Sequence, residues 1–170
     1  MNVFKIFGLL LILFCLSGCG EDSGSPNDLY SAYKPILMDT NSLFRSINFK
    51  PGRDVNNRGR VYVDAHNLYV VEYDLGVHFY DNANPSSPVQ TGFLNVPGIT
   101  DMQVVNQTMY VNNAVDMVAI NITNPANPVP GKRVRNVFPE PNTPDGLEIV
   151  QSYAQIPKNA VIVGWEKLSQ

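Results

Sequence analysis

Short runs of β-branched and aromatic residues, separated by turn residues such as Asn, Asp, Gly and Pro, occupy the middle of the chain. Their apolar and polar positions predict a first set of strands over residues 60–64, 67–73, 76–81 and 89–95. The same pattern predicts a second set over residues 101–105, 108–112, 116–122 and 128–135. Each set corresponds to one four-stranded antiparallel unit.

The two units repeat one another. Tyr69 corresponds to Tyr110 at an offset of 41 residues, and Pro85 corresponds to Pro125 at an offset of 40, so the second unit has lost one residue. In both units the motif Asn-Pro-x-x-Pro follows the third strand, because proline cannot donate to a strand ladder and asparagine favours a turn. A repeat of about 40 residues built from short strands is typical of β-propeller blades. We therefore predict an all-β fold of antiparallel, propeller-type blades.

Pieces of further units flank the two complete ones. Residues 43–49 predict the last strand of an incomplete upstream blade, while residues 145–150 and 160–165 predict two strands of a third unit. Residues 29–40 show no consistent period, and we expect them to be irregular. Propellers close with about four to eight blades, so two full blades plus partial ones form an open array.

An open array is expected to expose apolar surface at its two ends. Residues such as Phe44, Ile47, Val161 and Trp165 would lie on these faces. We therefore expect the chain either to form a homo-oligomer that completes the ring or to fold poorly.

The amino terminus has the features of an export signal. Lys5 supplies a positive charge, and residues 6–16 form an apolar run that is too short to span a membrane. The sequence Leu16-Ser17-Gly18-Cys19 follows directly and resembles the signal of bacterial lipoproteins. That resemblance implies cleavage between Gly18 and Cys19 and lipid attachment to the Cys19 thiol. The alternative is an ordinary secretory leader that happens to contain a cysteine.

This signal divides the chain into three parts and indicates where it resides. We expect a signal peptide over residues 1–18, a lipidated cysteine with a flexible tether and irregular segment over 19–42, and a propeller-like repeat region over 43–170. The mature chain would hold one cysteine, already lipid-linked, and no disulfide. Glu21 and Asp22 resemble the export signal of some Gram-negative outer-membrane lipoproteins, which favours the surface face over the periplasmic face. A plain solvated linker would look the same.

The first repeat unit resembles a known family. Leu68-Tyr69-Val70 together with residues 76–89 is similar to the LVIVD repeat, a propeller-type repeat of bacterial surface and secreted proteins. The second unit departs from the pattern, because Asp116 stands at the glycine position. The resemblance covers about residues 43–165 and implies an all-β ring, an envelope location and no catalytic residues. A full-length member would need more blades, so we expect a truncated or degenerate copy.

Composition and charge exclude some classes of partner. With 44% hydrophobic and 16% charged residues, the chain has the profile of a globular protein. The net charge is −3 and becomes −4 when the leader carrying Lys5 is removed. The basic cluster at residues 132–135 is too short to follow a nucleic-acid backbone, and a solvated edge strand explains it. We predict no nucleic-acid partner.

The sequence provides little support for a metal or cofactor. His66 and His78 are the two histidines, and the mature chain has neither a free thiol nor a helical histidine pair to complete a zinc site. The polar turn residues lack the alternating order of a calcium loop, so turn chemistry explains them better. These turn residues are Asp74, Asp81, Asn82, Asn84 and Asp116.

Candidate catalytic and binding residues lead to a main prediction and two alternatives. No Gly-x-Ser-x-Gly motif is present, and nothing fixes the separation of Glu72, Glu148 and Glu166 as a carboxylate pair. Five aromatic residues could form a binding face or pack in the core: Tyr69, Tyr73, Phe79, Tyr80 and Trp165. We predict a lipid-anchored, non-enzymatic envelope module that binds an unknown protein or glycan or serves as a scaffold. The alternatives are a glycan-active propeller enzyme using Glu72 and Glu148, and a non-functional fragment.

Overall fold

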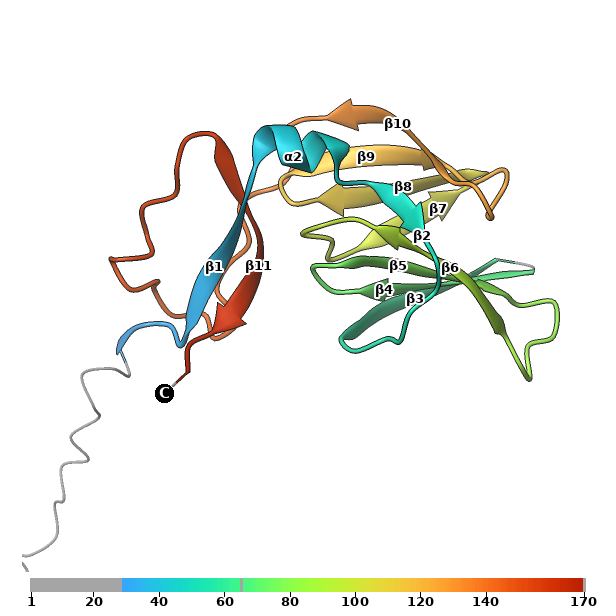
Figure 1. Ribbon diagram of the computed structural model, residues 1–170, viewed down its shortest axis with the longest axis horizontal. Coiled ribbons are helices and arrows are strands. Elements are labelled where there is room, and N and C mark those ends of the chain that lie inside the picture. The colour runs from blue at the N-terminus through green and yellow to red at the C-terminus, as the bar shows by residue number, and fades with distance from the viewer. Residues whose placement is uncertain (1–28, 65, 170) are drawn as a thin grey trace, which may run out of the picture.

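The computed structural model describes residues 29–64 and 66–169, and within these ranges the chain is all-β with one short helix, α2 (Thr40–Arg45) (Figure 1). The predicted signal peptide, the cleavage site between Gly18 and Cys19, and most of the tether lie outside the described residues. The strands are β1 (Tyr33–Asp39), β2 (Asn48–Lys50), β3 (Arg58–Asp64), β4 (Asn67–Glu72), β5 (Gly76–Asp81), β6 (Val89–Asn95), β7 (Met102–Val105), β8 (Thr108–Asn113), β9 (Asp116–Asn121), β10 (Val129–Val134) and β11 (Ala160–Lys167).

Two stacked antiparallel sheets form the larger part of the molecule. The five-stranded sheet has the order β2-β6-β5-β4-β3, and the four-stranded sheet has the order β10-β9-β8-β7. In each sheet the four strands of one predicted unit follow one another as a meander. All eight predicted strands of the two units are present, with ends that differ from the prediction by at most two residues. The prediction of an antiparallel all-β fold is confirmed.

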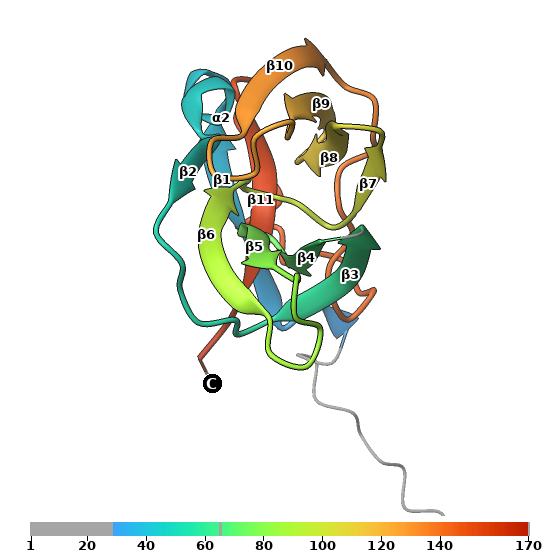
Figure 2. The ribbon, with the colours of Figure 1, turned by 90° about the vertical axis from the view of Figure 1, so that its right-hand side faces the viewer.

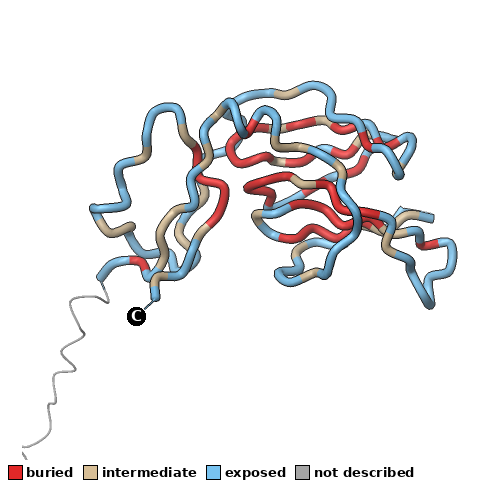
Figure 3. The backbone as a smooth tube through the Cα atoms, in the orientation of Figure 1, coloured by how far each residue is buried: buried red, intermediate tan, exposed pale blue. Residues whose placement is uncertain are grey.

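A continuous apolar core lies between these two sheets (Figure 3). Val71 and Val77 of the five-stranded sheet and Met109 and Ile120 of the four-stranded sheet are completely buried in it. Full burial of one such side chain stabilises the fold by roughly 1.5–3 kcal/mol. The sheets are therefore held together mainly by their facing apolar side chains.

The third sheet joins the two ends of the described chain. Strand β1 pairs antiparallel with β11, from Tyr33 opposite Lys167 to Asp39 opposite Ala160. This two-stranded sheet lies beside the ends of the stacked sheets, and the second view shows it behind them (Figures 1 and 2). A second apolar cluster fixes it there: Leu43, Ala114, Val115, Val161 and Val163.

Three predictions on the flanking segments were wrong. Residues 33–39, expected to be irregular, form β1, because their pairing partner lies more than a hundred residues downstream. The expected strand over residues 43–49 begins as helix α2, since the Asp39 carboxylate caps the N–H groups of Asn41 and Ser42 at 3.1 and 3.0 Å. Residues 145–150 form no strand and contribute one isolated bridge, between Glu148 and Tyr30.

Strand β2 also differs from the prediction in its position. It pairs with β6 and extends the sheet of the first unit, instead of belonging to an upstream blade. Phe49 of β2 packs edge-on against Phe79, with ring centroids 5.3 Å apart. This aromatic contact gives β2 its place in the five-stranded sheet.

The apolar surfaces expected at the ends of the array are largely covered. Val161 is buried, and Ile47 packs against the core between the sheets. Phe44 remains 39% exposed, but the guanidinium groups of Arg133 and Arg135 lie over its ring at 4.8 and 4.3 Å. Within the described residues, none of the three sheets closes on itself.

Substitution of Gly98 tests the close contact between Ala114 and the segment that connects the two stacked sheets. Its φ of +73° is in the left-handed region, and an added Cβ would lie 2.9 Å from the backbone of Ala114. We expect Gly98→Ala to lower the free energy of unfolding by at least about 3 kcal/mol, from backbone strain together with this contact. Urea denaturation followed by circular dichroism measures the change.

Gly146→Ala is the matched control for this substitution. Gly146 has a similar φ of +71°, but apart from its two chain neighbours no described residue has an atom within 4 Å of the position of an added Cβ. This variant should lose only about 1 kcal/mol, because it has the backbone strain without the contact. Equal losses in the two variants would show that the approach to Ala114 does not limit the packing.

Candidate functional site

A buried carboxylate–imidazole pair lies on the face of the five-stranded sheet that points away from the four-stranded sheet. Glu72 of β4 and His78 of β5 both have fully buried side chains, and Oε2 of Glu72 is 2.8 Å from Nε2 of His78. The His78 ring also contacts the Phe93 ring, with centroids 4.7 Å apart. A buried carboxylate needs partners for all of its charge, so its surroundings decide what Glu72 can do.

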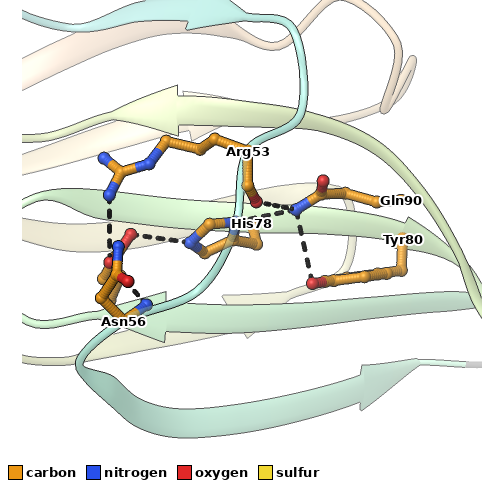
Figure 4. Close-up of polar contacts among 6 residues, drawn as sticks. Arg53, Asn56, His78, Tyr80 and Gln90 are labelled. Atoms are coloured by element: carbon orange, nitrogen blue, oxygen red, sulfur yellow. Dashed lines mark hydrogen bonds and ion pairs between the residues drawn. The ribbon is translucent and has the colours of Figure 1, made fainter.

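The loop of residues 51–57 covers this pair and supplies the missing partners (Figure 4). Arg53 Nη2 and the backbone N–H of Asn56 donate to Oε1 of Glu72 at 3.1 and 3.0 Å. Gln90 Nε2 donates to the carbonyl oxygen of Arg53 at 2.8 Å and lies 2.9 Å from Nδ1 of His78. We refer to Arg53, Asn56, Glu72, His78 and Gln90 as the Glu72 cluster.

These contacts define the protonation pattern of His78. The carbonyl oxygen of Arg53 only accepts, so the side chain of Gln90 must present its NH2 group to it. The same NH2 group faces Nδ1 of His78, which therefore accepts a hydrogen bond, while Nε2–H donates to Glu72. The cluster is a chain of polar contacts in which each member orients the next.

The Glu72 carboxylate is held in its ionised form. Burial alone would raise its pKa, but the Asn56 N–H, the His78 ring and the Arg53 guanidinium outweigh burial and lower the pKa below its ordinary value. Both carboxylate oxygens are occupied by protein groups, and the side chain has no exposed surface. Glu72 thus stabilises the sheet and is not placed to contact a substrate.

The two other candidate carboxylates lie elsewhere. Glu148 is exposed and bridges to Tyr30, near the start of β1. Glu166 of β11 forms an ion pair with Lys34 at 3.1 Å, and both side chains are exposed. The structure therefore does not assemble Glu72 and Glu148 into a catalytic pair.

The four-stranded sheet has a polar cluster at the equivalent position. Asn113 follows Glu72 by 41 residues and is completely buried, and Asp116 at the start of β9 is nearly so. Arg133 donates to Asp116 at 2.9 Å and to Asn113 at 2.8 Å. Arg133 was expected to be a solvated charge on an edge strand, and this is wrong, because only 11% of its side chain is exposed. Both repeat units thus place a buried arginine-bound acid at one end of the sheet.

A half-open cavity of about 500 Å³ lies where the stacked sheets meet the two-stranded sheet. Its apolar lining includes Met102, Tyr110 and Met117 of the four-stranded sheet together with Phe138 and Val163. Asn112 also lines it, and both ends of its side chain are hydrogen-bonded. Its Oδ1 accepts from the N–H groups at positions 100 and 101, and its Nδ2 donates to the carbonyl at position 98. The surface that lines the cavity is mainly apolar.

Asp74 is one of three carboxylate residues in the lining of this cavity, together with Asp101 and Glu140. It lies in the β4–β5 turn with a φ of +64°, and its backbone is fixed by hydrogen bonds to Ile99 and Gly98 at 2.8 and 3.0 Å. Within the described residues, no hydrogen bond or ion pair reaches its carboxylate. Burial raises the pKa of Asp74 above its ordinary value.

The remaining histidine and turn residues serve local structure. His66 is exposed, and its carbonyl oxygen accepts from the N–H of Asn82. Asp81 and Asn84 accept from backbone N–H groups two residues ahead, which is ordinary turn chemistry. Over residues 29–64 and 66–169, no three His, Cys, Asp or Glu side chains are grouped so as to hold a metal ion. In the same ranges, no helix has the length and apolar character needed to cross a bilayer.

The predicted aromatic binding face does not form. Tyr69 and Phe79 are buried in the core and contact each other edge-on at 4.9 Å, and burial, with the nearby Asp64 and Tyr62, raises the pKa of Tyr69 to about 12. Tyr80 points toward Gln90 on the opposite face. Trp165 is half-buried, and its Nε1 has no hydrogen-bond partner among the described residues. The alternative of core packing is correct for Tyr69 and Phe79.

Sequence reasoning missed the residues that depend on distant folding. Arg53 and Asn56 meet Glu72 because the loop of residues 51–57 crosses strands that follow it in the chain, and Gln90 meets His78 because β6 pairs with β5. Asp74 was interpreted only as a turn residue. One available signal was Gly164, since a glycine inside an otherwise apolar strand often marks the close approach of another group.

Comparisons with known proteins add no assignment. None of the protein-family models matches the chain. Searches of the curated proteins and of the solved structures also give no significant match. The resemblance to LVIVD repeats stays a prediction from the sequence. A functional proposal therefore has to be argued from the geometry of the sites described above.

Glu72→Gln should destabilise the fold without a change in side-chain volume. The new NH2 group would face either the Nε2–H of His78 or the donors Arg53 and Asn56, so at least one buried donor would lose its acceptor. We expect the free energy of unfolding to fall by about 2–3 kcal/mol. Glu166→Gln, which removes an exposed ion pair, should change it by less than about 1 kcal/mol. Similar effects in urea denaturation would contradict the role of the cluster.

The Glu72 carboxylate should also make the stability of the fold depend on pH. Its pKa is lower in the folded state than its ordinary value of 4.5, so the unfolded state binds protons first. The stabilisation is present above that value and is lost as the pH falls through the folded-state pKa. Urea denaturation between about pH 6 and pH 3 should show a shallower loss for Glu72→Gln than for the wild type. Parallel curves would refute this coupling.

Proposed function

We propose that this chain is a lipid-anchored lipoprotein of the bacterial cell envelope whose repeat region acts as a non-enzymatic binding module. The observation that carries the binding role is the half-open cavity of about 500 Å³ beside the carboxylate of Asp74. The polar groups of the Glu72 cluster and the Arg133 contacts bind one another. This cavity instead has a mainly apolar lining and the carboxylate of Asp74, which has no hydrogen bond or ion pair with the described residues.

The lipid anchor rests on the amino-terminal sequence. A positive residue, a short apolar run and small residues before Cys19 together favour lipoprotein processing over an ordinary leader. The acidic tether behind Cys19 favours the outer membrane and its surface face. An anchored module with a ligand cavity is consistent with capture of a molecule at the envelope.

We also infer that the two stacked sheets are neighbouring blades of a propeller-type array. Tyr69 faces the core between the sheets, whereas its repeat equivalent Tyr110 lies on the outer face of the next sheet. Equivalent faces therefore point in the same direction along the stack, as they do when blades follow one another around an axis. Two sheets related by a two-fold axis would instead turn equivalent faces toward each other.

No observation on the described residues favours the glycan-active alternative. Glu72 has no exposed surface, and Glu148 lies in the segment beside Tyr30. A binding role requires neither residue.

Metabolic labelling with a fatty acid tests the anchor. The wild-type chain, expressed in a Gram-negative host, should incorporate label, and Cys19→Ala should lose it, because the thiol of Cys19 is the proposed attachment point. Cys15→Ala is the matched control and should label like the wild type, since Cys15 leaves with the leader. Equal labelling of wild type and Cys19→Ala would remove the envelope location from the proposal.

A further inference from the structure

Hydrogen bonds hold the backbone of Asp74 in place, but no cation among the described residues pairs with its carboxylate. Its backbone N–H and carbonyl oxygen are both hydrogen-bonded to the segment that connects the two stacked sheets, at Ile99 and Gly98. The side chain is therefore fixed at its base, and its Oδ2 would be 3.2 Å from a Cβ added at Gly164. A glycine in the middle of β11 leaves the space that this carboxylate occupies.

The residues that line the cavity carry more negative than positive charges. Asp74, Asp101 and Glu140 line it together with Arg60. The one guanidinium in this lining is already paired, because Nε of Arg60 lies 3.1 Å from the carboxylate of Asp101. Asp74 is thus left without a cation from the described residues, in a site whose net charge disfavours anions.

The apolar part of the lining suits a compact organic group. Met102, Met117, Tyr110 and Phe138 line the same cavity as Asp74. Aromatic faces and methionine sulfur are polarisable surfaces that accept apolar groups, and aromatic faces also attract cations. A ligand with a positive group and an apolar body would satisfy both parts of the cavity.

We propose that this cavity binds an organic cation, an ammonium or guanidinium group carried on a small apolar body, with the carboxylate of Asp74 as the acceptor for the positive group. The inference rests on the proposed binding function and gives it a ligand class. Asp74 supplies the charge and the hydrogen-bond acceptor, and the apolar wall excludes water from the ion pair. Neutral ligands of the same shape would gain only the apolar contacts.

Calorimetric titration with benzylamine, which is protonated at neutral pH, tests this proposal on the full chain in a non-ionic detergent. Benzyl alcohol is the matched neutral probe, because it has the same ring and replaces the ammonium with a hydroxyl group. We expect saturable binding of benzylamine that is at least about tenfold tighter than binding of benzyl alcohol. Equal affinity for the two probes would overturn the cation specificity while leaving a binding cavity in place.

The variant Asp74→Asn tests whether the side chain of Asp74 causes the preference for benzylamine over benzyl alcohol. Asparagine tolerates the positive φ at this position, so the variant removes the charge with little backbone strain. It should bind benzylamine and benzyl alcohol equally, whereas Asp54→Asn, which removes an exposed carboxylate outside the cavity lining, should keep the wild-type preference. Unchanged benzylamine affinity in Asp74→Asn would refute the role of Asp74.

The two proposals fail in different ways. If the wild type incorporates no fatty-acid label, the proposal of a lipid anchor is refuted, and the proposal that the cavity binds an organic cation is unaffected. Absence of saturable benzylamine binding would overturn the ligand class, while the labelling of Cys19 would still support the envelope location.

Discussion

The packing of the five-stranded sheet against the four-stranded sheet is the constraint on which the rest of the structure depends. Among the described residues, fourteen buried apolar residues form this core, and five form the cluster that holds the two-stranded sheet. Since apolar burial is the largest favourable contribution to folding, the sheet-to-sheet contact supplies most of the stabilisation. Every other feature, including the cavity and both polar clusters, is built at the edges or outer faces of this stack.

The two repeat units retain a buried polar position but use it differently. In the first unit it holds Glu72, bound by His78 and by a loop that arrives from an earlier part of the chain. In the second unit it holds Asn113, next to Asp116 and bound by Arg133 of the following strand. Both solutions satisfy the rule that a buried acid must be paired and hydrogen-bonded. The buried polar position recurs in both repeat units, whereas the residues that bind it differ between the two sheets.

The cavity exists because three separate parts of the chain meet. The β4–β5 turn contributes Asp74, the second repeat unit contributes the methionine wall, and β11 contributes Val163 beside the glycine at position 164. Pairing of β11 with β1 holds the last of these parts in place. A local segment could not form this site, since its lining includes Asp74 and Val163, which are 89 positions apart in the chain.

The sequence by itself determined the all-β class, the eight strands of the two repeat units and the turn role of residues such as Asp81 and Asn84. These features follow from local preferences, because strand and turn propensities act between residues that are neighbours in the chain. Only the tertiary structure decided that residues 33–39 are a strand, that helix α2 replaces the start of a predicted one, and that Glu72 is sealed inside the protein. Each of these depends on a partner or covering segment that is distant in the sequence. The same reason applies to Asp74, because the cavity that it lines is formed largely by residues far from it in the chain.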